Sequence, residues 1–86
     1  EAFHLVDIGA VTVAEVDAAI AHGPGLRWAL MGPVLLQHLS GGPAGLRHTL
    51  DHLGPAQERW WTDLGSPRLD ESLKGKLVAG VGEELA

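Results

Sequence analysis

The 86-residue sequence contains no cysteine, so neither a disulfide framework nor a zinc site built on thiolates can stabilise it. A chain of this length forms one domain at most and removes only about 60 to 70% of its unfolded surface from water on folding. Its own apolar core is therefore marginal, and we expect a packing partner to supply the missing stability.

Basic residues are scarce, because six Lys and Arg face 11 Asp and Glu and the net charge is -5. Nucleic-acid binding requires a concentrated basic face that releases counterions from phosphates, and the sequence has no such stripe. Its apolar runs are far shorter than the roughly 20 residues needed to cross a bilayer, and no basic and then apolar signal segment opens the chain. We therefore predict a cytoplasmic protein that binds neither nucleic acid nor a membrane.

Glycine and proline are abundant instead, with 12 and five copies, and they divide the sequence into short segments. Apolar residues within these segments recur at helical spacing, and no segment alternates convincingly as a strand would. The sequence thus predicts an all-α fold of five to six short helices. Glu1 reads as part of a helix body without a capping residue, from which we expect further chain upstream.

The clearest helix start is at Thr12 and Glu15, which have the spacing of a capping box. The first helix is expected to end at Gly9, and the capped one at Gly23. Pro33 suits the first position of a later helix that runs to about Ser40, and residues 26–31 form a short irregular or helical segment before it.

Two further boundaries are predicted from glycine and proline. Gly54 is expected to end a short helix and Pro55 to open the next one. Ser66 and Pro67 are expected to cap and start the last helix. Three glycines in that helix each weaken it by about 1 kcal/mol relative to alanine; they are Gly75, Gly80 and Gly82. Either the helix frays or the glycines let a neighbouring element approach closely, and we favour fraying near the C-terminus.

Four short motifs follow one another along the chain: Asp7-Ile8-Gly9, the segment 10–17, Gly23-Pro24-Gly25 and Met31-Gly32-Pro33. Their order resembles the 3-hydroxyacyl-CoA dehydrogenase C-terminal domain. The form of segment 25–33 looks more like the branch that contains carnitine dehydrogenase, gulonate dehydrogenase and lambda-crystallin. Segments 41–48 and 61–64 are similar to the carnitine dehydrogenase members in particular.

The resemblance implies that residues 1–86 are a helical C-terminal domain of the 6-phosphogluconate dehydrogenase kind, which forms a homodimer and closes the substrate cleft. The whole enzyme would oxidise the 3-hydroxy group of an acyl-CoA or a free acid to a 3-oxo group. The resemblance places NAD and the catalytic His and Glu on an N-terminal Rossmann domain that is absent from this sequence. We therefore expect no catalytic and no cofactor-binding residue here, and no activity of these residues alone.

Arg27 and Trp28 are the predicted substrate-binding residues. A guanidinium can hold a carboxylate through two parallel hydrogen bonds, and a free hydroxy acid presents such a group. The alternative is a solvated arginine stacked on Trp28. The family pattern favours contact with the substrate.

Four apolar residues, Trp60, Trp61, Leu73 and Leu77, are predicted at the dimer interface, because this chain lacks the material to cover them. His48 and His52 have the spacing of two metal ligands on a helix. No third ligand is evident, so we predict a polar outer face and no metal. Two other functions stay open: a stand-alone helical interaction module, and a non-enzymatic structural protein of the crystallin kind.

Overall fold

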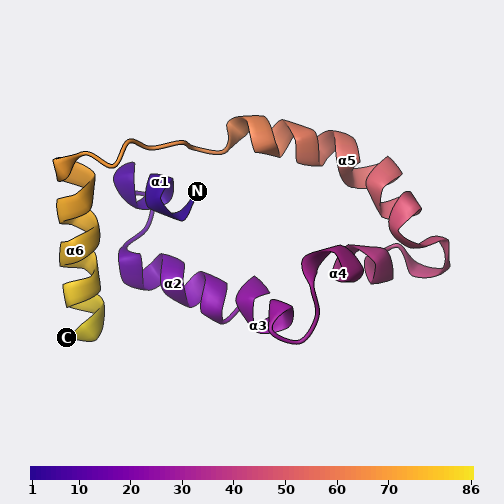
Figure 1. Cartoon of the computed structure of the whole chain (residues 1–86), viewed down its shortest axis with the longest axis horizontal. Coiled ribbons are helices and arrows are strands. Elements are labelled where there is room, and N and C mark those ends of the chain that lie inside the picture. Colours follow the sequence, from indigo (N-terminus) through magenta and orange to yellow (C-terminus); the bar gives the residue numbers. More distant parts are fainter. The chain divides into compact units, whose positions relative to one another are not determined.

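The computed structural model describes residues 1–86 and contains six α-helices, one 3-10 helix and no strand, which confirms the all-α prediction. The chain divides into two compact units (Figure 1). Unit 1 contains Glu1–Gly23 and Gly65–Ala86, and unit 2 contains Pro24–Leu64.

Unit 1 is a three-helix cluster of α1 (Ala2–Asp7), α2 (Val13–Ala21) and α6 (Glu71–Leu85). Each helix supplies one buried apolar side chain to its core, and these are Val6, Val13 and Leu73. Leu73 is completely buried. Because full burial of such side chains stabilises by about 1.5 to 3 kcal/mol each, this small core holds the three helices together.

Two local signals set the connection between α1 and α2 as predicted. Gly9 follows the end of α1 with a φ of 76°, a left-handed conformation that glycine adopts without strain. The Thr12 hydroxyl accepts a hydrogen bond from the Glu15 backbone N–H at 3.1 Å, and the Glu15 carboxylate accepts one from the Thr12 N–H at 2.9 Å. The capping box at the start of α2 is therefore confirmed.

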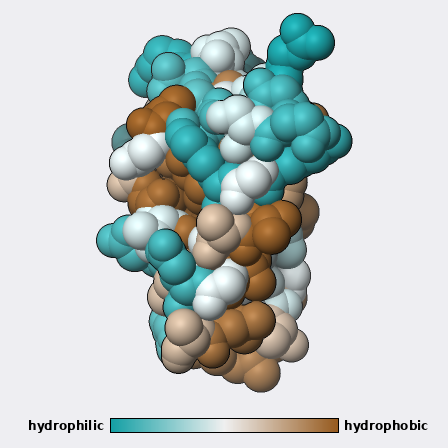
Figure 2. Space-filling view, turned by 90° about the vertical axis from the view of Figure 1, so that its left-hand side faces the viewer, coloured by the Kyte–Doolittle hydropathy of each residue, from teal (hydrophilic) through white to brown (hydrophobic).

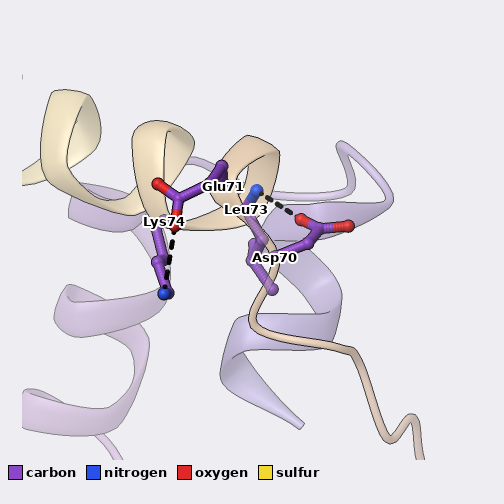
Figure 3. Close-up of polar contacts among 4 residues, drawn as sticks. All are labelled: Asp70, Glu71, Leu73 and Lys74. Carbon is purple, nitrogen blue, oxygen red and sulfur yellow. Dashed lines mark hydrogen bonds and ion pairs between the residues drawn. The ribbon is translucent and has the colours of Figure 1, made fainter.

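The start of α6 was wrongly predicted, because the helix begins at Glu71 and not at Ser66 and Pro67. Asp70 has an extended backbone, and its carboxylate accepts a hydrogen bond from the Leu73 N–H at 2.9 Å (Figure 3). The figure also shows the ion pair between Lys74 and Glu71 in the first turn, in which the ammonium lies 3.3 Å from the carboxylate. Asp70 therefore provides the cap that we assigned to a residue upstream.

The non-helical segment before Asp70 contacts the start of α1 at Gly65. The Gly65 N–H donates a hydrogen bond to the Glu1 carboxylate at 2.8 Å. Gly65 also lies so close to His4 that a Cβ there would overlap the imidazole ring. This contact between residues distant in sequence fixes the entry of the segment into unit 1.

The prediction of fraying in α6 was also wrong, since the helix continues through all three of its glycines to Leu85. Gly80 packs against α2, and a Cβ at this position would lie 2.8 Å from the Val13 Cβ. The Lys76 ammonium donates a hydrogen bond to the Asp7 carbonyl at the end of α1, at 2.9 Å. Contacts with both neighbouring helices therefore hold α6 along its length.

Unit 2 contains three α-helices and a short 3-10 helix: α3 (Pro24–Trp28), α4 (Pro33–Ser40), η1 (Gly42–Ala44) and α5 (Gly45–Asp63). Pro33 begins α4 as predicted. The predicted break between Gly54 and Pro55 was wrong, because α5 is one helix of 19 residues with Pro55 inside it. A proline inside a helix removes one backbone hydrogen bond, and α5 is bonded to Gln37 of α4 on both sides of Pro55, through Thr49 and Gln57.

Polar groups join α4 and α5. The Gln37 carbonyl of α4 accepts hydrogen bonds from the Thr49 hydroxyl of α5 at 2.7 Å and from the Ser40 hydroxyl of its own helix at 2.8 Å. The Leu46 N–H donates to His38 Nδ1 at 3.0 Å. Hydrogen bonds of this kind fix the pairing of the two helices but add only about 0.5 to 1.5 kcal/mol each.

Unit 2 buries no large apolar side chain, since its only buried residues are Gly45 and Thr49. It contains eleven of the 18 large apolar residues that the chain leaves exposed: Leu26, Trp28, Leu30, Val34, Leu35, Leu39, Leu50, Leu53, Trp60, Trp61 and Leu64. This unit therefore has ample apolar surface for a partner to cover.

Candidate functional site

The predicted substrate-binding residues lie together at the end of α3. The carbonyl of Arg27 accepts backbone hydrogen bonds from the N–H groups of Leu30 and Met31, both at 3.0 Å. These bonds close the last turn of the helix and fix the backbone from which Arg27 and Trp28 project.

Neither side chain of this pair is engaged within the chain. Arg27 is exposed and takes part in no side-chain hydrogen bond or ion pair. Trp28 is 50% exposed, and the only stacked rings in the chain are those of His48 and His52. The guanidinium is therefore free to pair with an anion, and the indole face is free to contact a ligand.

The histidine pair on α5 lies on a polar surface. The rings of His48 and His52 are parallel to within 1°, with centroids 6.1 Å apart. The nearby carboxylate of Asp51 is held by the Arg47 guanidinium at 3.0 Å. The chain has no group of three His, Cys, Asp or Glu residues that can hold a metal ion, and we assign this pair no chemistry.

Unit 1 contains an apolar groove of about 430 Å³ between its three helices, lined by Phe3, Val13, Asp17, Leu77, Val78 and Val81. Figure 2 looks onto the α6 side of unit 1 and shows hydrophobic side chains gathered among hydrophilic ones. Leu77 was predicted at a dimer interface, and the other residues of this lining were not predicted as site residues. In the sequence, apolar residues recur every four positions at Leu69, Leu73, Leu77, Val81 and Leu85. This recurrence indicates an apolar side of α6 but not the helices that pack against it.

Two carboxyl groups meet across α2 and α6 beside this groove. A side-chain hydrogen bond with Asp17 raises the pKa of Glu84, and partial desolvation and charge repulsion from Asp17 act in the same direction. Asp17 is also the only charged residue in the lining of the groove. This end of unit 1 therefore carries an unfavourable concentration of negative charge at neutral pH.

The four predicted interface residues belong to different units, with two tryptophans in unit 2 and two leucines in unit 1. Trp60 and Trp61 are 59% and 65% exposed, and Leu77 is half-buried in the wall of the groove. The prediction of Leu73 at the dimer interface was wrong, because this side chain is completely buried in the core of unit 1 and leaves no surface for a partner. Leu73 and Leu77 are four residues apart on the same side of α6, so their spacing in the sequence did not show which of the two is buried.

Comparison with known proteins gives one family. Residues 1–74 match the family described as 3-hydroxyacyl-CoA dehydrogenase, C-terminal domain. The chain is 53% identical over 83 residues to an L-carnitine dehydrogenase of Streptomyces griseus, which covers 96% of the chain and 25% of that relative. It is 52% identical over 80 residues to an L-carnitine dehydrogenase of Bacillus cereus, which covers 93% of the chain and 24% of that relative.

A third relative, an L-carnitine dehydrogenase of Nocardiopsis dassonvillei, is 48% identical over 86 residues, covering 100% of the chain and 26% of the relative. The chain thus spans about a quarter of the length of the curated relatives it matches. No solved structure matches it. None of its helices combines the length and the apolar character needed to span a membrane.

Proposed function

The chain belongs to the 3-hydroxyacyl-CoA dehydrogenase C-terminal domain family, and on that premise we propose that it is the substrate and dimerisation domain of an NAD-dependent dehydrogenase acting on a free 3-hydroxy acid of the carnitine type. The observation that carries the proposal is an identity of about half over nearly the whole chain to relatives named L-carnitine dehydrogenase. The enzyme would oxidise the 3-hydroxy group of the acid to a 3-oxo group. A cytoplasmic location stays a prediction.

In this proposal the chemistry is divided between this domain and the other three quarters of the protein. NAD and the catalytic His and Glu belong to an N-terminal Rossmann domain, and the helices described above close the substrate cleft. The free guanidinium of Arg27 supports a role in holding the substrate carboxylate, since two parallel hydrogen bonds give such a pair both strength and orientation.

Steady-state kinetics of the intact enzyme test this role. We expect Arg27→Ala to raise the KM for the acid by at least tenfold, because loss of a charge-assisted pair costs about 1.5 to 3 kcal/mol. The KM for NAD is expected to stay within about twofold. Arg59→Ala is the matched control, because Arg59 is also exposed and forms no ion pair. Equal changes in both KM values would remove Arg27 from the substrate site.

A second copy of the chain is the proposed cover for the apolar surface of unit 2. Each tryptophan adds about 150 to 250 Å² of contact area on burial, and a standard interface needs about 800 Å² from each partner. Trp60 and Trp61, together with neighbouring exposed leucines, can provide a large share of that area. Symmetric homodimers are the commonest oligomers of soluble proteins.

Sedimentation of the intact protein tests the dimer. Trp61→Glu places a charge on the proposed interface and is expected to shift the protein to a monomer. His52→Glu is the control, because the nine residues between it and Trp61 correspond to about two and a half helical turns, which places the two side chains on opposite faces of α5. A wild-type monomer, or a Trp61→Glu variant that remains dimeric, argues against this interface.

A further inference from the structure

Arg27 and Trp28 are consecutive residues with complementary binding chemistry. A guanidinium pairs with an anion, whereas the face of an indole attracts a cation through the ring quadrupole. Neither is used within the chain, because Arg27 has no acidic partner and the half-exposed Trp28 ring stacks on no other ring. The end of α3 therefore offers one site for each sign of charge.

The substrate named for the relatives has one group of each sign. L-Carnitine carries a carboxylate at one end and a trimethylammonium group at the other, with the 3-hydroxy group on the carbon between them. A trimethylammonium group has no N–H to donate, and its outer surface is hydrocarbon. Aromatic rings are the usual receptors for such quaternary cations.

No carboxylate close in sequence competes with Trp28 for this cation. The segment 18–50 contains neither Asp nor Glu, and the first acidic residue after it, Asp51, is held by Arg47 at 3.0 Å. A cation that binds beside α3 thus meets an indole and not an acidic side chain from this stretch. Tryptophan is the best of the aromatic residues for that contact.

The spacing also suits a short zwitterion. The Cα atoms of Arg27 and Trp28 are about 3.8 Å apart across a trans peptide bond. Their side chains leave the helix about 100° apart, and the long arginine stem can turn its guanidinium toward a ligand that rests on the indole. One small molecule can therefore touch both groups.

We propose that Trp28 determines specificity by binding the quaternary ammonium group of a 3-hydroxy acid whose carboxylate is held by Arg27. This inference rests on the proposed function and adds the residue that recognises the quaternary ammonium end of the substrate. Trp28 acts on recognition and not on hydride transfer, so its loss changes KM and leaves kcat nearly unaltered.

The test compares two substrates of the intact enzyme: L-carnitine, and the isostere in which a carbon atom replaces the nitrogen, called the neutral isostere because that end of the molecule then carries no charge. Trp28→Leu is expected to raise the KM for L-carnitine by about thirtyfold, since a desolvated cation–π contact contributes about 2 kcal/mol. The KM for the neutral isostere is expected to change less than about threefold. Trp28→Phe, which keeps a weaker aromatic face, is expected to fall between wild type and Trp28→Leu.

His48→Leu is the matched control, because it removes another exposed aromatic ring from the same unit, to which no role is assigned, and is expected to leave the ratio of the two KM values unchanged. An unchanged KM for NAD shows that each variant is folded. If Trp28→Leu raises both acid KM values equally, Trp28 contributes only apolar packing and the proposal is overturned. The same holds if neither KM value changes.

Failure of the proposed function gives a different result. A wild-type enzyme that does not oxidise L-carnitine refutes that function, and calorimetry of tetramethylammonium binding to wild type and to Trp28→Phe then decides the aromatic site by itself. Weaker binding to the variant supports the cation site at Trp28. Equal binding, or no binding to the wild type, overturns it.

Discussion

Gly80 provides the sharpest test of how unit 1 is held together. It lies in α6 against Val13 of α2, and a Cβ built on it would be 2.8 Å from the Val13 Cβ. Gly75 and Gly82 are in the same helix, yet a Cβ at either position meets nothing within 4 Å. Alanine substitutions at the three positions therefore share one helix and differ in their surroundings.

The expected free energies follow from two opposing effects. Alanine in place of glycine in a helix interior stabilises by about 0.8 to 1.0 kcal/mol, and at Gly75 and Gly82 nothing opposes that gain. At Gly80 the new methyl group overlaps Val13, and overpacking of a closed contact costs about 1 to 3 kcal/mol. We expect Gly80→Ala to destabilise by about 1 kcal/mol net, some 2 kcal/mol below Gly75→Ala.

Urea and thermal unfolding followed by circular dichroism measure this difference, which corresponds to a separation in Tm on the order of 10 °C between the two variants. Val13→Ala combined with Gly80→Ala provides a further check. The double variant is expected to lose less stability than the two single losses together, because the smaller side chain makes room for the methyl group. If Gly80→Ala is as stabilising as Gly75→Ala, α6 does not pack on α2 through this glycine.

Three further substitutions test the caps and charges of unit 1 by the same unfolding measurements. Asp70→Ala is expected to destabilise by about 0.5 to 2 kcal/mol through loss of the helix cap, and an unchanged midpoint would mean that α6 starts elsewhere. Hydrogen bonds from the Thr12 backbone and side chain lower the pKa of Glu15 below 4.5. Its contribution to stability is therefore present above pH 4.5 and lost as pH falls through the lower folded value, a pH dependence that Glu15→Gln should remove. The pKa of Glu84 is raised above 4.5 beside Asp17, so its favourable contribution is present below pH 4.5 and lost as pH rises through the folded value. Glu84→Gln should raise the Tm at pH 7 and leave it unchanged at pH 3; a lower Tm at pH 7 contradicts the repulsion.

The sequence predicted which residues form the candidate site but not their surroundings. Arg27 and Trp28 were proposed from their residue types and from the family motif in which they lie. The structure adds that both are exposed and that neither has a partner within the chain. Whether an arginine is already paired depends on side chains far away in sequence, so no local pattern could decide it.

By itself the sequence determined the class of fold and the ends of helices whose signals act over a few residues. The Thr12 capping box, the turn at Gly9 and the start at Pro33 each depend on backbone groups within one helical turn. Tertiary structure decided the remaining features. It carried α5 through Pro55, and it buried Leu73 while leaving Leu77 at a groove. These outcomes depend on which helices meet, and helices far apart in the chain meet only when the whole unit has folded.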